Sequence, residues 1–462
     1  MNIFRLRENQ TNLRTEVVAG LTTYFTMAYI IFVNPSILAK AGMDYNSVLV
    51  ATCLAAALGT LLMAFLANYP FAQAPGMGLN AFFTFAVVLQ SGFSWQQGLA
   101  IVFISGVLFI LLTLTGARSA VVDALPTSIR YAIPAGIGLF ITLIGFNNAG
   151  VVRVNQGPII DLVLSAETLE AGALVESINQ APAQILELAD FTTPSALLAG
   201  VGLLVITVLY ALRVQGAILF SIVLTTLIGI PLGVSPVPES FSFSDIQLGS
   251  TLFQLDFAGL FADDTSIVSV LATLLVVVLS FSLVDLFDTI GTLIGTADKG
   301  GFLDENGQLP RLKRALLADA LATTFGALVG TSTVTTFIES NAGVAAGGRT
   351  GLTSLVTGVL FLLSIFLAPL AGMVPAAATA PALILVGMLM MQSVRRIDFA
   401  DFENALPAFL TIVLMPFTYS IANGIAAGII FYVCIKLVKG KARQIPLVLY
   451  IMALLFVLKF IV

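Results

Sequence analysis

The sequence contains no histidine and only two cysteines among its 462 residues. Without histidine, the chain lacks the commonest metal ligand and the usual proton shuttle near neutral pH. The two cysteines, Cys53 and Cys434, both lie inside apolar stretches and indicate neither a disulfide framework nor a metal site. We therefore expect no metal and no cofactor.

Charged residues are also scarce. They make up 10% of the chain, whereas hydrophobic residues make up 58%, and a typical soluble domain carries about 25% charged residues. Apolar runs recur from Glu16 to the last residue, and many approach the roughly 20 residues that cross a bilayer as a helix. A membrane barrel would instead show alternating segments of about 10 residues. The composition predicts an all-α polytopic membrane protein.

The apolar runs and the breakers between them predict fourteen transmembrane segments, and a further apolar stretch at 445–461 either crosses the membrane or lies along it. The N-terminal stretch is polar and basic without a cleavage site, which indicates mature protein rather than a signal peptide. The predicted segments are 16–38, 47–68, 72–90, 95–116, 127–147, 193–211, 215–233, 267–297, 313–330, 331–346, 351–372, 377–393, 404–421 and 422–437.

The distribution of lysine and arginine predicts the orientation, because these residues favour the cytoplasmic side. With a cytoplasmic N-terminus, the inside connections hold Arg5, Arg7, Arg14, Arg118, Arg130, Arg213, Lys299, Arg311, Lys313, Arg314, Arg349, Arg395, Arg396, Lys436, Lys439, Lys441 and Arg443. The outside connections hold only Lys40 and Arg153, with Lys459 near the ambiguous end. Two long outside connections are acidic instead, with Asp161, Glu167, Glu170, Glu176, Glu187 and Asp190 in one and Glu239, Asp245, Asp256, Asp263 and Asp264 in the other.

Seven segments, an acidic outside connection and seven more segments indicate a duplication. Because each half holds an odd number of segments, the second half starts from the opposite side, which makes the repeats inverted. The third segment of each half is short and broken by glycine, proline or hydroxyl residues: AQAPGMGLNAFF (72–83) and GTSTVTTFIESNAG (330–343). A matched pair of interrupted segments points to the mid-membrane site of a transporter.

Backbone that leaves regular helix at membrane depth must be satisfied by protein, water or ligand. Pro75 and the glycines at 76 and 78 permit a turn, and a half-helix starting near Gly78 would present N–H groups and Asn80 toward the midplane. The second half offers the same layout at 330–336, followed by Glu339. The alternative is that small residues merely let helices pack closely.

The stretch SFSLVDLFDTIGTLIGTAD (280–298) places polar residues at spacings of three or four, on one helix face: Ser282, Asp285, Asp288, Thr292 and Thr296. A carboxylate near the bilayer centre costs roughly 2.5–3.5 kcal/mol, so three of them, Asp285, Asp288 and Glu339, need a reason. Burial raises the pKa of a carboxyl group in general, so one of the three can carry a proton. A structural hydrogen-bond network is the alternative, and it is the one we favour for Asp319.

Other uses of these residues are less well supported. Paired carboxylates hold magnesium and diphosphate in membrane prenyltransferases, but those enzymes usually carry a second Asp-rich cluster, which is missing here. The sequence has no P-loop for ATP-driven transport. An anion carrier should place a cation near the broken segments, and neither 74–90 nor 330–346 contains lysine or arginine.

Five stretches together resemble the nucleobase:cation symporter-2 family, and more narrowly its AzgA-like branch of permeases for adenine, guanine and hypoxanthine. They are LRTEVVAGLTTYFTMAYIIFVNP (13–35), APGMGLNAFF (74–83), VDLFDTIGTLIG (284–295), STVTTFIESNAGVAAGGRTGLTS (332–354) and ATAPALILVG (378–387). They occur in the family's order across essentially the whole chain.

The resemblance implies a 7+7 inverted repeat divided into a core and a gate. The core would comprise 16–116 and 267–372, the gate 127–233 and 377–437, and the substrate would lie between them. The family's acidic residues fall on Asp288 and Glu339 and its polar residue on Asn80, while Gly78, Leu79 and the backbone of Thr335, Thr336, Phe337 and Ile338 complete the site. Relatives that transport uracil or xanthine typically have histidine where this chain has Thr292, so proton coupling would run through Asp288, Glu339 or both, with Asp285 as a further candidate.

We therefore expect a secondary transporter that imports a purine base with a proton across a bacterial cytoplasmic membrane. Its expected partners are the base, the proton and the lipid bilayer, without nucleic acid, and the resemblance implies a homodimer through the gate. The alternatives are an uncoupled purine facilitator, an anion transporter of the same architecture and, less favoured, a membrane-embedded enzyme. The preferred purine and the proton stoichiometry are left open.

Overall fold

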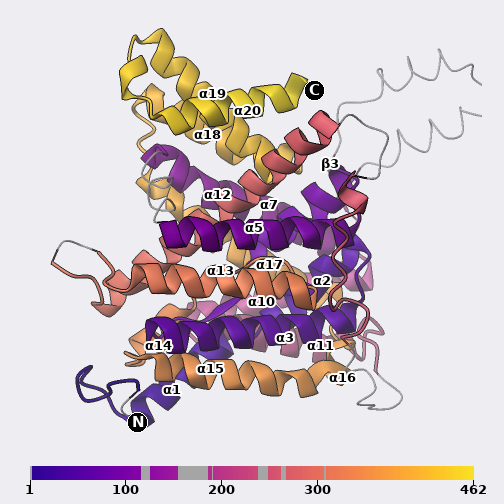
Figure 1. Ribbon diagram of the computed structural model, residues 1–462. Helices are drawn as coiled ribbons and strands as arrows, with labels where there is room; N and C mark the ends of the chain where they lie inside the picture. Colours follow the sequence, from indigo (N-terminus) through magenta and orange to yellow (C-terminus); the bar gives the residue numbers. More distant parts are fainter. Residues whose placement is uncertain are drawn as a thin grey trace, which may run out of the picture.

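The computed structural model describes residues 3–115, 125–154, 186–189, 191–237, 248–261, 267–305 and 308–461. Long helices lie side by side through most of this part of the chain (Figure 1). Within the described residues, eight helices are long and apolar enough to cross a bilayer, and four shorter apolar helices accompany them. The predicted all-α polytopic architecture is confirmed, while the number of crossings stays a prediction.

The first half of the chain contains ten main helices and strands among its described residues, and side-chain caps fix several of their starts. Asn12 accepts a hydrogen bond from the Thr15 N–H at the start of α1, and Asp44 and Thr193 cap α3 and α10 in the same way. The elements are α1 (Leu13–Met27), α2 (Ile30–Leu38), α3 (Tyr45–Leu62), β1 (Gln73–Pro75), α4 (Met77–Ala81), the π-helix η3 (Phe82–Gln90), α5 (Trp95–Thr115), α7 (Thr127–Asn148), α10 (Pro194–Ala211) and α11 (Ala217–Gly229).

The second half follows the same plan and adds a C-terminal helix. Gly330 ends α13 in the left-handed conformation, with φ of 97°, which glycine adopts without strain. The elements are α12 (Ile267–Gly300), α13 (Leu312–Val329), β4 (Val334–Thr336), α14 (Ser340–Ala345), α15 (Gly351–Leu363), α16 (Ala368–Ala371), α17 (Ala376–Met390), α18 (Phe402–Phe417), α19 (Ile421–Val438) and α20 (Leu447–Ile461). A second small ribbon, β2 (Val152–Val154) with β3 (Leu186–Leu188), lies outside this plan.

The packing of the helices repeats between the two halves. Helix α1 packs on α15, and its counterpart α12 packs on α5. Helix α3 packs on α15 as α13 packs on α5, and α10 packs on α17 as α18 packs on α7. The self-related pairs α3–α13, β1–β4 and α7–α17 also meet. This pattern is what an inverted repeat of two seven-segment halves requires.

Two sets of helices pack more extensively within themselves than with each other. The first contains α1–α5 and α12–α16, and the second contains α7, α10, α11 and α17–α19. We call them the first bundle and the second bundle. Whether these bundles are the expected core and gate is not tested by this arrangement, so the functional division stays a prediction.

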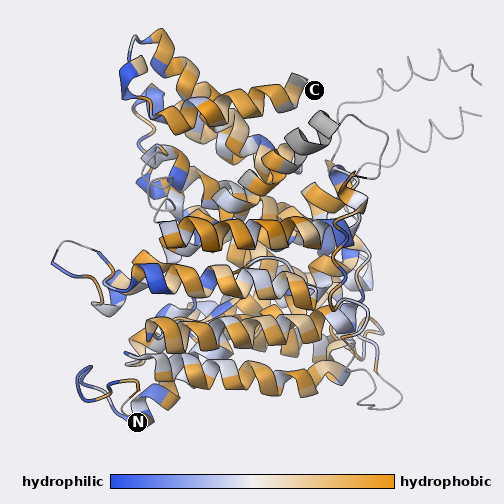
Figure 2. Ribbon diagram, in the orientation of Figure 1, coloured by the Kyte–Doolittle hydropathy of each residue, from blue (hydrophilic) through white to orange (hydrophobic). Residues whose placement is uncertain are grey.

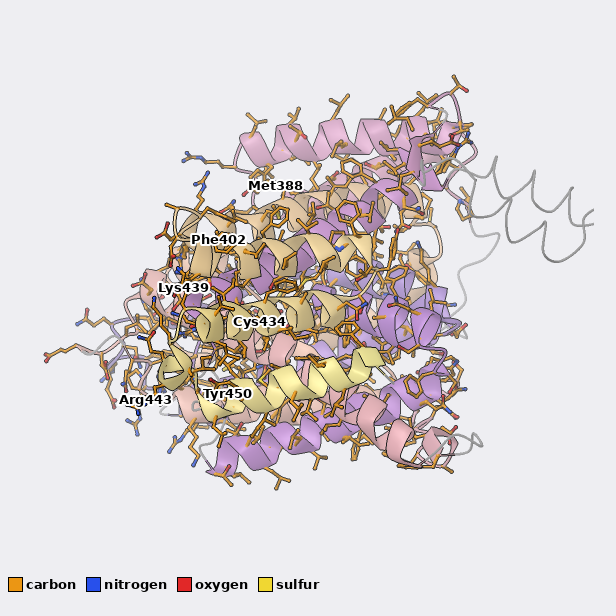
Figure 3. All side chains as sticks on the ribbon, turned by 90° about the horizontal axis from the view of Figure 1, so that it is seen from above. Met388, Phe402, Cys434, Lys439, Arg443 and Tyr450 are labelled. Carbon is orange, nitrogen blue, oxygen red and sulfur yellow. The ribbon has the colours of Figure 1, made fainter. Side chains whose placement is uncertain are left out.

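The polar and apolar residues are segregated along the helices. Figure 2 shows apolar helix bodies and a concentration of polar residues at the end where the N-terminus lies. At this end Glu403 forms ion pairs with Lys436 and Lys439 at 2.6 and 2.9 Å and also with Lys441; Lys439 lies where α19 turns back toward α20 (Figure 3). We call this end the basic end. It matches the side on which the sequence places most lysine and arginine.

The stretch 445–461 forms α20, which packs on α19 of the second bundle and on α12 of the first. Its 15 residues span about 22 Å, less than the roughly 30 Å of hydrocarbon in a bilayer. Several charges used for the predicted orientation lie outside the described residues: Arg118, Asp161, Glu167, Glu170, Glu176, Asp190, Glu239, Asp245, Asp263 and Asp264.

Candidate substrate-binding site

The two broken segments meet as a short antiparallel ribbon in the middle of the first bundle. Strand β1 pairs with β4 in the register Gln73–Thr336, Ala74–Thr335 and Pro75–Val334. The ribbon extends by one bond at each end, because the Gly76 N–H donates to the Thr333 carbonyl at 3.0 Å and the Phe337 N–H to the Ala72 carbonyl at 2.9 Å. The sequence predicted two interrupted segments at mid-depth; the structure shows that each satisfies backbone groups of the other.

A threonine on the preceding helix supports each strand in the same way. Thr60 of α3 donates to the Gln73 carbonyl at 3.0 Å and accepts from the Gln73 N–H at 2.9 Å. Thr323 of α13 does the same for Val334, at 2.9 and 3.2 Å. Both threonines are fully buried. The two halves therefore correspond down to single side chains. In each half a threonine hydroxyl bonds the N–H and the carbonyl of a strand residue, groups that a continuous helix would have paired within itself.

These threonines give a stability prediction. Thr323→Val removes a hydroxyl that satisfies two buried backbone groups, so we expect the free energy of unfolding to fall by about 1–3 kcal/mol. Thr207→Val is the matched control, since Thr207 is exposed and bonds only within its own helix. Thermal unfolding of both variants in detergent checks this; equal melting of Thr323→Val and wild type would contradict the supporting role.

The half-helix α4 begins at Met77, directly after Gly76, and carries the predicted residues Gly78, Leu79 and Asn80, all buried. The Asn80 side-chain oxygen accepts a hydrogen bond from the Ser332 hydroxyl. Its amide nitrogen donates to the Pro75 carbonyl at 3.4 Å. Asn80 thus ties α4 to Ser332, two residues before β4, so the two broken segments are joined by a side chain as well as by backbone.

Asp288 lies on α12 beside β4. The Thr335 hydroxyl is 3.4 Å from one carboxylate oxygen of Asp288, which makes this a long hydrogen bond. Asp288 is only partly buried, whereas Thr335 and Thr292, one turn further along α12, are buried. The structure therefore brings two predicted site residues from different segments, Asp288 and Thr335, into contact.

Glu339 lies at the start of α14, at the far end of the β4 segment. One of its oxygens accepts a hydrogen bond of 2.5 Å from the buried hydroxyl of Tyr29. Glu339 itself is partly exposed, and the neighbouring Ile338 is 55% exposed although Thr336 and Phe337 are buried. Asp288 meets Thr335, which precedes Glu339 by four residues in the same broken segment. Both acidic residues thus lie at the ribbon without being fully buried as residues.

The other carboxylates of this region are fully buried. Asp319 of α13 accepts a 2.7 Å hydrogen bond from Thr289, which agrees with the structural role expected for it. Asp285 is also fully buried. Its place as a third proton-coupling candidate stays a prediction, and so do the contacts of the predicted residues with a substrate.

The sequence interpretation missed Tyr29 and Asn34. The predicted segment 16–38 is two helices, interrupted at Ala28 and Tyr29, where Tyr29 meets Glu339. Asn34 donates to Thr52 at 2.7 Å and to Thr331, just before β4, at 2.9 Å. Polar side chains inside an apolar run were the available signal.

The half-helix α4 also faces the second bundle. A Cβ added at Gly78 would lie 2.6 Å from the Ile137 side chain of α7, closer than real atoms approach. Only glycine fits at this contact without a shift. The half-helix of the first broken segment therefore lies directly against the bundle predicted to form the gate.

The sequence matches the permease family (Xan_ur_permease) over residues 14–181 and 159–427. The chain belongs to this family. That confirms the resemblance seen in its motifs and places the chain among transporters rather than enzymes.

Two curated relatives cover almost the whole chain. The adenine permease AdeP of Escherichia coli is 43% identical over 99% of this chain and 95% of its own length. The guanine/hypoxanthine permease PbuO of Bacillus subtilis is 43% identical over 99% of this chain and 100% of its own length. This permease is similar to relatives named for different purines at equal identity, so identity alone does not select one.

Among solved structures, the transmembrane domain of a cyanobacterial bicarbonate transporter, BicA, aligns with a TM-score of 0.62 at 15% identity, covering 90% of this chain and 97% of that one. At this identity the likeness concerns the fold alone. It confirms the predicted 7+7 inverted-repeat fold for the permease.

Proposed function

We propose that this permease imports a purine base together with a proton across a bacterial cytoplasmic membrane, with its N-terminus in the cytoplasm. The observation that carries the proposal is the pair of acidic residues, Asp288 and Glu339, whose carboxylates lie beside the β1–β4 ribbon on hydrogen bonds from Thr335 and Tyr29. A purine edge presents ring N–H groups and exocyclic groups, and carboxylates accept hydrogen bonds from such donors. The names of the relatives, adenine and guanine/hypoxanthine permeases, support this substrate class.

The two carboxylates differ in their surroundings, and we assign them different roles. The short hydrogen bond from Tyr29 stabilises Glu339 as an acceptor, which suits a group that binds substrate N–H donors. Asp288 has the longer contact of 3.4 Å with Thr335 and so is held less tightly. In this proposal Glu339 anchors the base and Asp288 takes up the coupled proton.

Coupling requires that protonation and substrate binding favour each other, which makes the two effects reciprocal. Repulsion between carboxylates on neighbouring segments would supply such a link, because a proton on Asp288 lowers the cost of binding an electron-rich base beside the charged Glu339. Movement of the first bundle against the second would then carry the site from one side to the other. The contact between Gly78 and Ile137 lies on the surface between the bundles where that movement would occur.

The function is tested by uptake of labelled adenine, guanine and hypoxanthine into proteoliposomes with an imposed proton gradient. We expect concentrative uptake of at least one base, abolished by a protonophore. Equilibration that ignores the gradient would make the protein a facilitator, and no uptake of any of the three would overturn the purine assignment. Bicarbonate uptake in the same vesicles would favour the anion alternative.

A further inference from the structure

Helix α12 is packed differently in its part before Asp288 and in its part after Asp288. On the side away from the basic end, the face that carries Asp288 continues through Val284, Phe281 and Val277, at helical spacings of three or four. These three side chains are 1%, 0% and 6% exposed. Phe281 also packs edge-on against Phe82 of η3, with ring centres 4.7 Å apart. This half of the face is closed by protein.

On the side toward the basic end, the same face is open. Gly291 is exposed and Gly295 is partly exposed, and neither would bring an added Cβ within 4 Å of another atom. Asp298 and Lys299, further along the same face, are exposed as well. A strip of accessible positions at helical spacing, Gly291, Gly295 and Asp298, therefore follows Asp288 toward the basic end of the molecule, beside the buried Thr292 and Thr296.

The composition of this strip differs from that of a lipid-facing surface. Helix α10 presents such a surface, where Leu197, Leu204 and Val208 are 54%, 69% and 55% exposed around Gly200. The strip on α12 instead consists of glycines and charged residues. Asp298 and Lys299 at the end of the strip require water, and the strip lacks the exposed leucine and valine side chains of the lipid-facing surface on α10.

At the opposite end, polar groups join the two bundles. The Gln90 side chain, at the end of η3, donates to the Thr418 carbonyl between α18 and α19 at 3.0 Å. Lys40, in the turn after α2, donates to the Asn148 side chain at the end of α7. Each bond links a residue of the first bundle to one of the second.

Aromatic rings add to this closure. Phe85 of the first bundle packs edge-on against Phe140 and Tyr419 of the second, with centres 6.1 and 6.4 Å apart, and Lys40 lies 5.8 Å above the Phe85 ring. A cavity of about 280 Å³ remains at this end between η3, α12, α19 and α20. Val277 lines it, whereas Phe281, one turn closer to Asp288, is fully buried.

We propose that Gly291 and Gly295 line the route by which substrate passes between the carboxylates and the basic end, and that Lys40, Gln90 and Phe85 close the opposite route through the second bundle. Resting on the proposed transport function, this assigns the structure to the state open toward the cytoplasm. At 291 and 295 glycine leaves the route free of side chains.

Thiol labelling tests the open route. In a Cys434→Ser background, which removes the exposed cysteine on α19 (Figure 3) and leaves only the buried Cys53, Gly291→Cys and Gly295→Cys are exposed to a charged, membrane-impermeant methanethiosulfonate. We expect both to react in inside-out vesicles at least about tenfold faster than Gly200→Cys, whose thiol faces lipid and does not ionise readily. Reaction no faster than that of Gly200→Cys would overturn the route.

Labelling is read without any transported substrate, so its outcome is independent of the purine assignment. Labelling from the cytoplasmic side with no purine uptake would support the route but overturn the proposed function. Slower labelling in the presence of the transported base is the expected result if the route carries it, and unchanged labelling at saturating base would contradict a route occupied by substrate.

Cross-linking tests the closed side. In the same background, Lys40→Cys with Asn148→Cys is treated with a short bifunctional methanethiosulfonate that replaces the length of the lysine side chain. We expect cross-linking to stop transport, a reductant to restore it, and Gly291→Cys to stay reactive while cross-linked. Failure to cross-link, or undiminished transport by cross-linked protein, would contradict a closure that opens in each cycle.

Discussion

Glu339→Gln is expected to lower the affinity for the purine base about 10- to 100-fold. Glutamine keeps the size of the side chain but removes the charge, and a hydrogen bond to a charged group contributes about 1.5–3 kcal/mol, each 1.4 kcal/mol being a factor of ten in affinity. The amide also presents a donor where the carboxylate presents only acceptors. Binding of labelled base to purified protein measures the effect without requiring turnover.

The control for this substitution is Glu8→Gln, because Glu8 is exposed and pairs only with Arg5 at 3.6 Å in the described structure. It should bind like wild type. Tyr29→Phe removes the 2.5 Å hydrogen bond while leaving the carboxylate, so it should weaken binding less than Glu339→Gln does. Wild-type affinity in Glu339→Gln would show that Glu339 is structural and that the anchor lies elsewhere.

We expect Asp288→Asn to abolish accumulation of the base against its gradient while exchange of the base across the membrane continues. Asparagine cannot take up the proton, so the ratio of internal to external base at steady state should fall to about one, the value of passive equilibration, because the link between the two gradients is lost. Exchange of labelled for unlabelled base across the membrane should continue, since the anchor at Glu339 is intact. Both quantities are measured in proteoliposomes with and without a proton gradient.

Asp398→Asn serves as the matched control, because Asp398 lies in an exposed turn and bonds only to the nearby Ala400 N–H among the described contacts. Its accumulation ratio should equal that of wild type. If Asp288→Asn still accumulates base against its gradient, the proton travels on another group. If it loses exchange and binding as well, Asp288 belongs to the substrate anchor.

Much of the architecture is predictable from the sequence because it follows from local patterns. Apolar run length predicts the helices, and proline, glycine and hydroxyl residues mark the two broken segments. The helical spacing around Asp288 predicts a polar face on α12, and the structure shows that Asp288 meets Thr335 of the second broken segment. These features need only neighbouring residues, so no knowledge of the fold is required to see them.

The partners of the buried polar groups are not predictable in this way, because they come from distant segments. Glu16 marks only the start of an apolar run in the sequence, yet in the structure it accepts hydrogen bonds from the Arg349 N–H at 2.9 Å and the Thr353 hydroxyl at 2.6 Å. Tyr29 and Glu339 are likewise separated by 310 positions. Only the packing of the inverted repeat brings such pairs together.

The most direct test of the central claim, that purine and proton move together through the Asp288–Glu339 site, is proton movement driven by the base. Proteoliposomes that enclose a pH-sensitive dye receive the transported base from outside, with no proton gradient imposed. The account predicts that the lumen acidifies in wild type and in Asp398→Asn but not in Asp288→Asn. Entry of labelled base into wild-type vesicles without any change in luminal pH would contradict it.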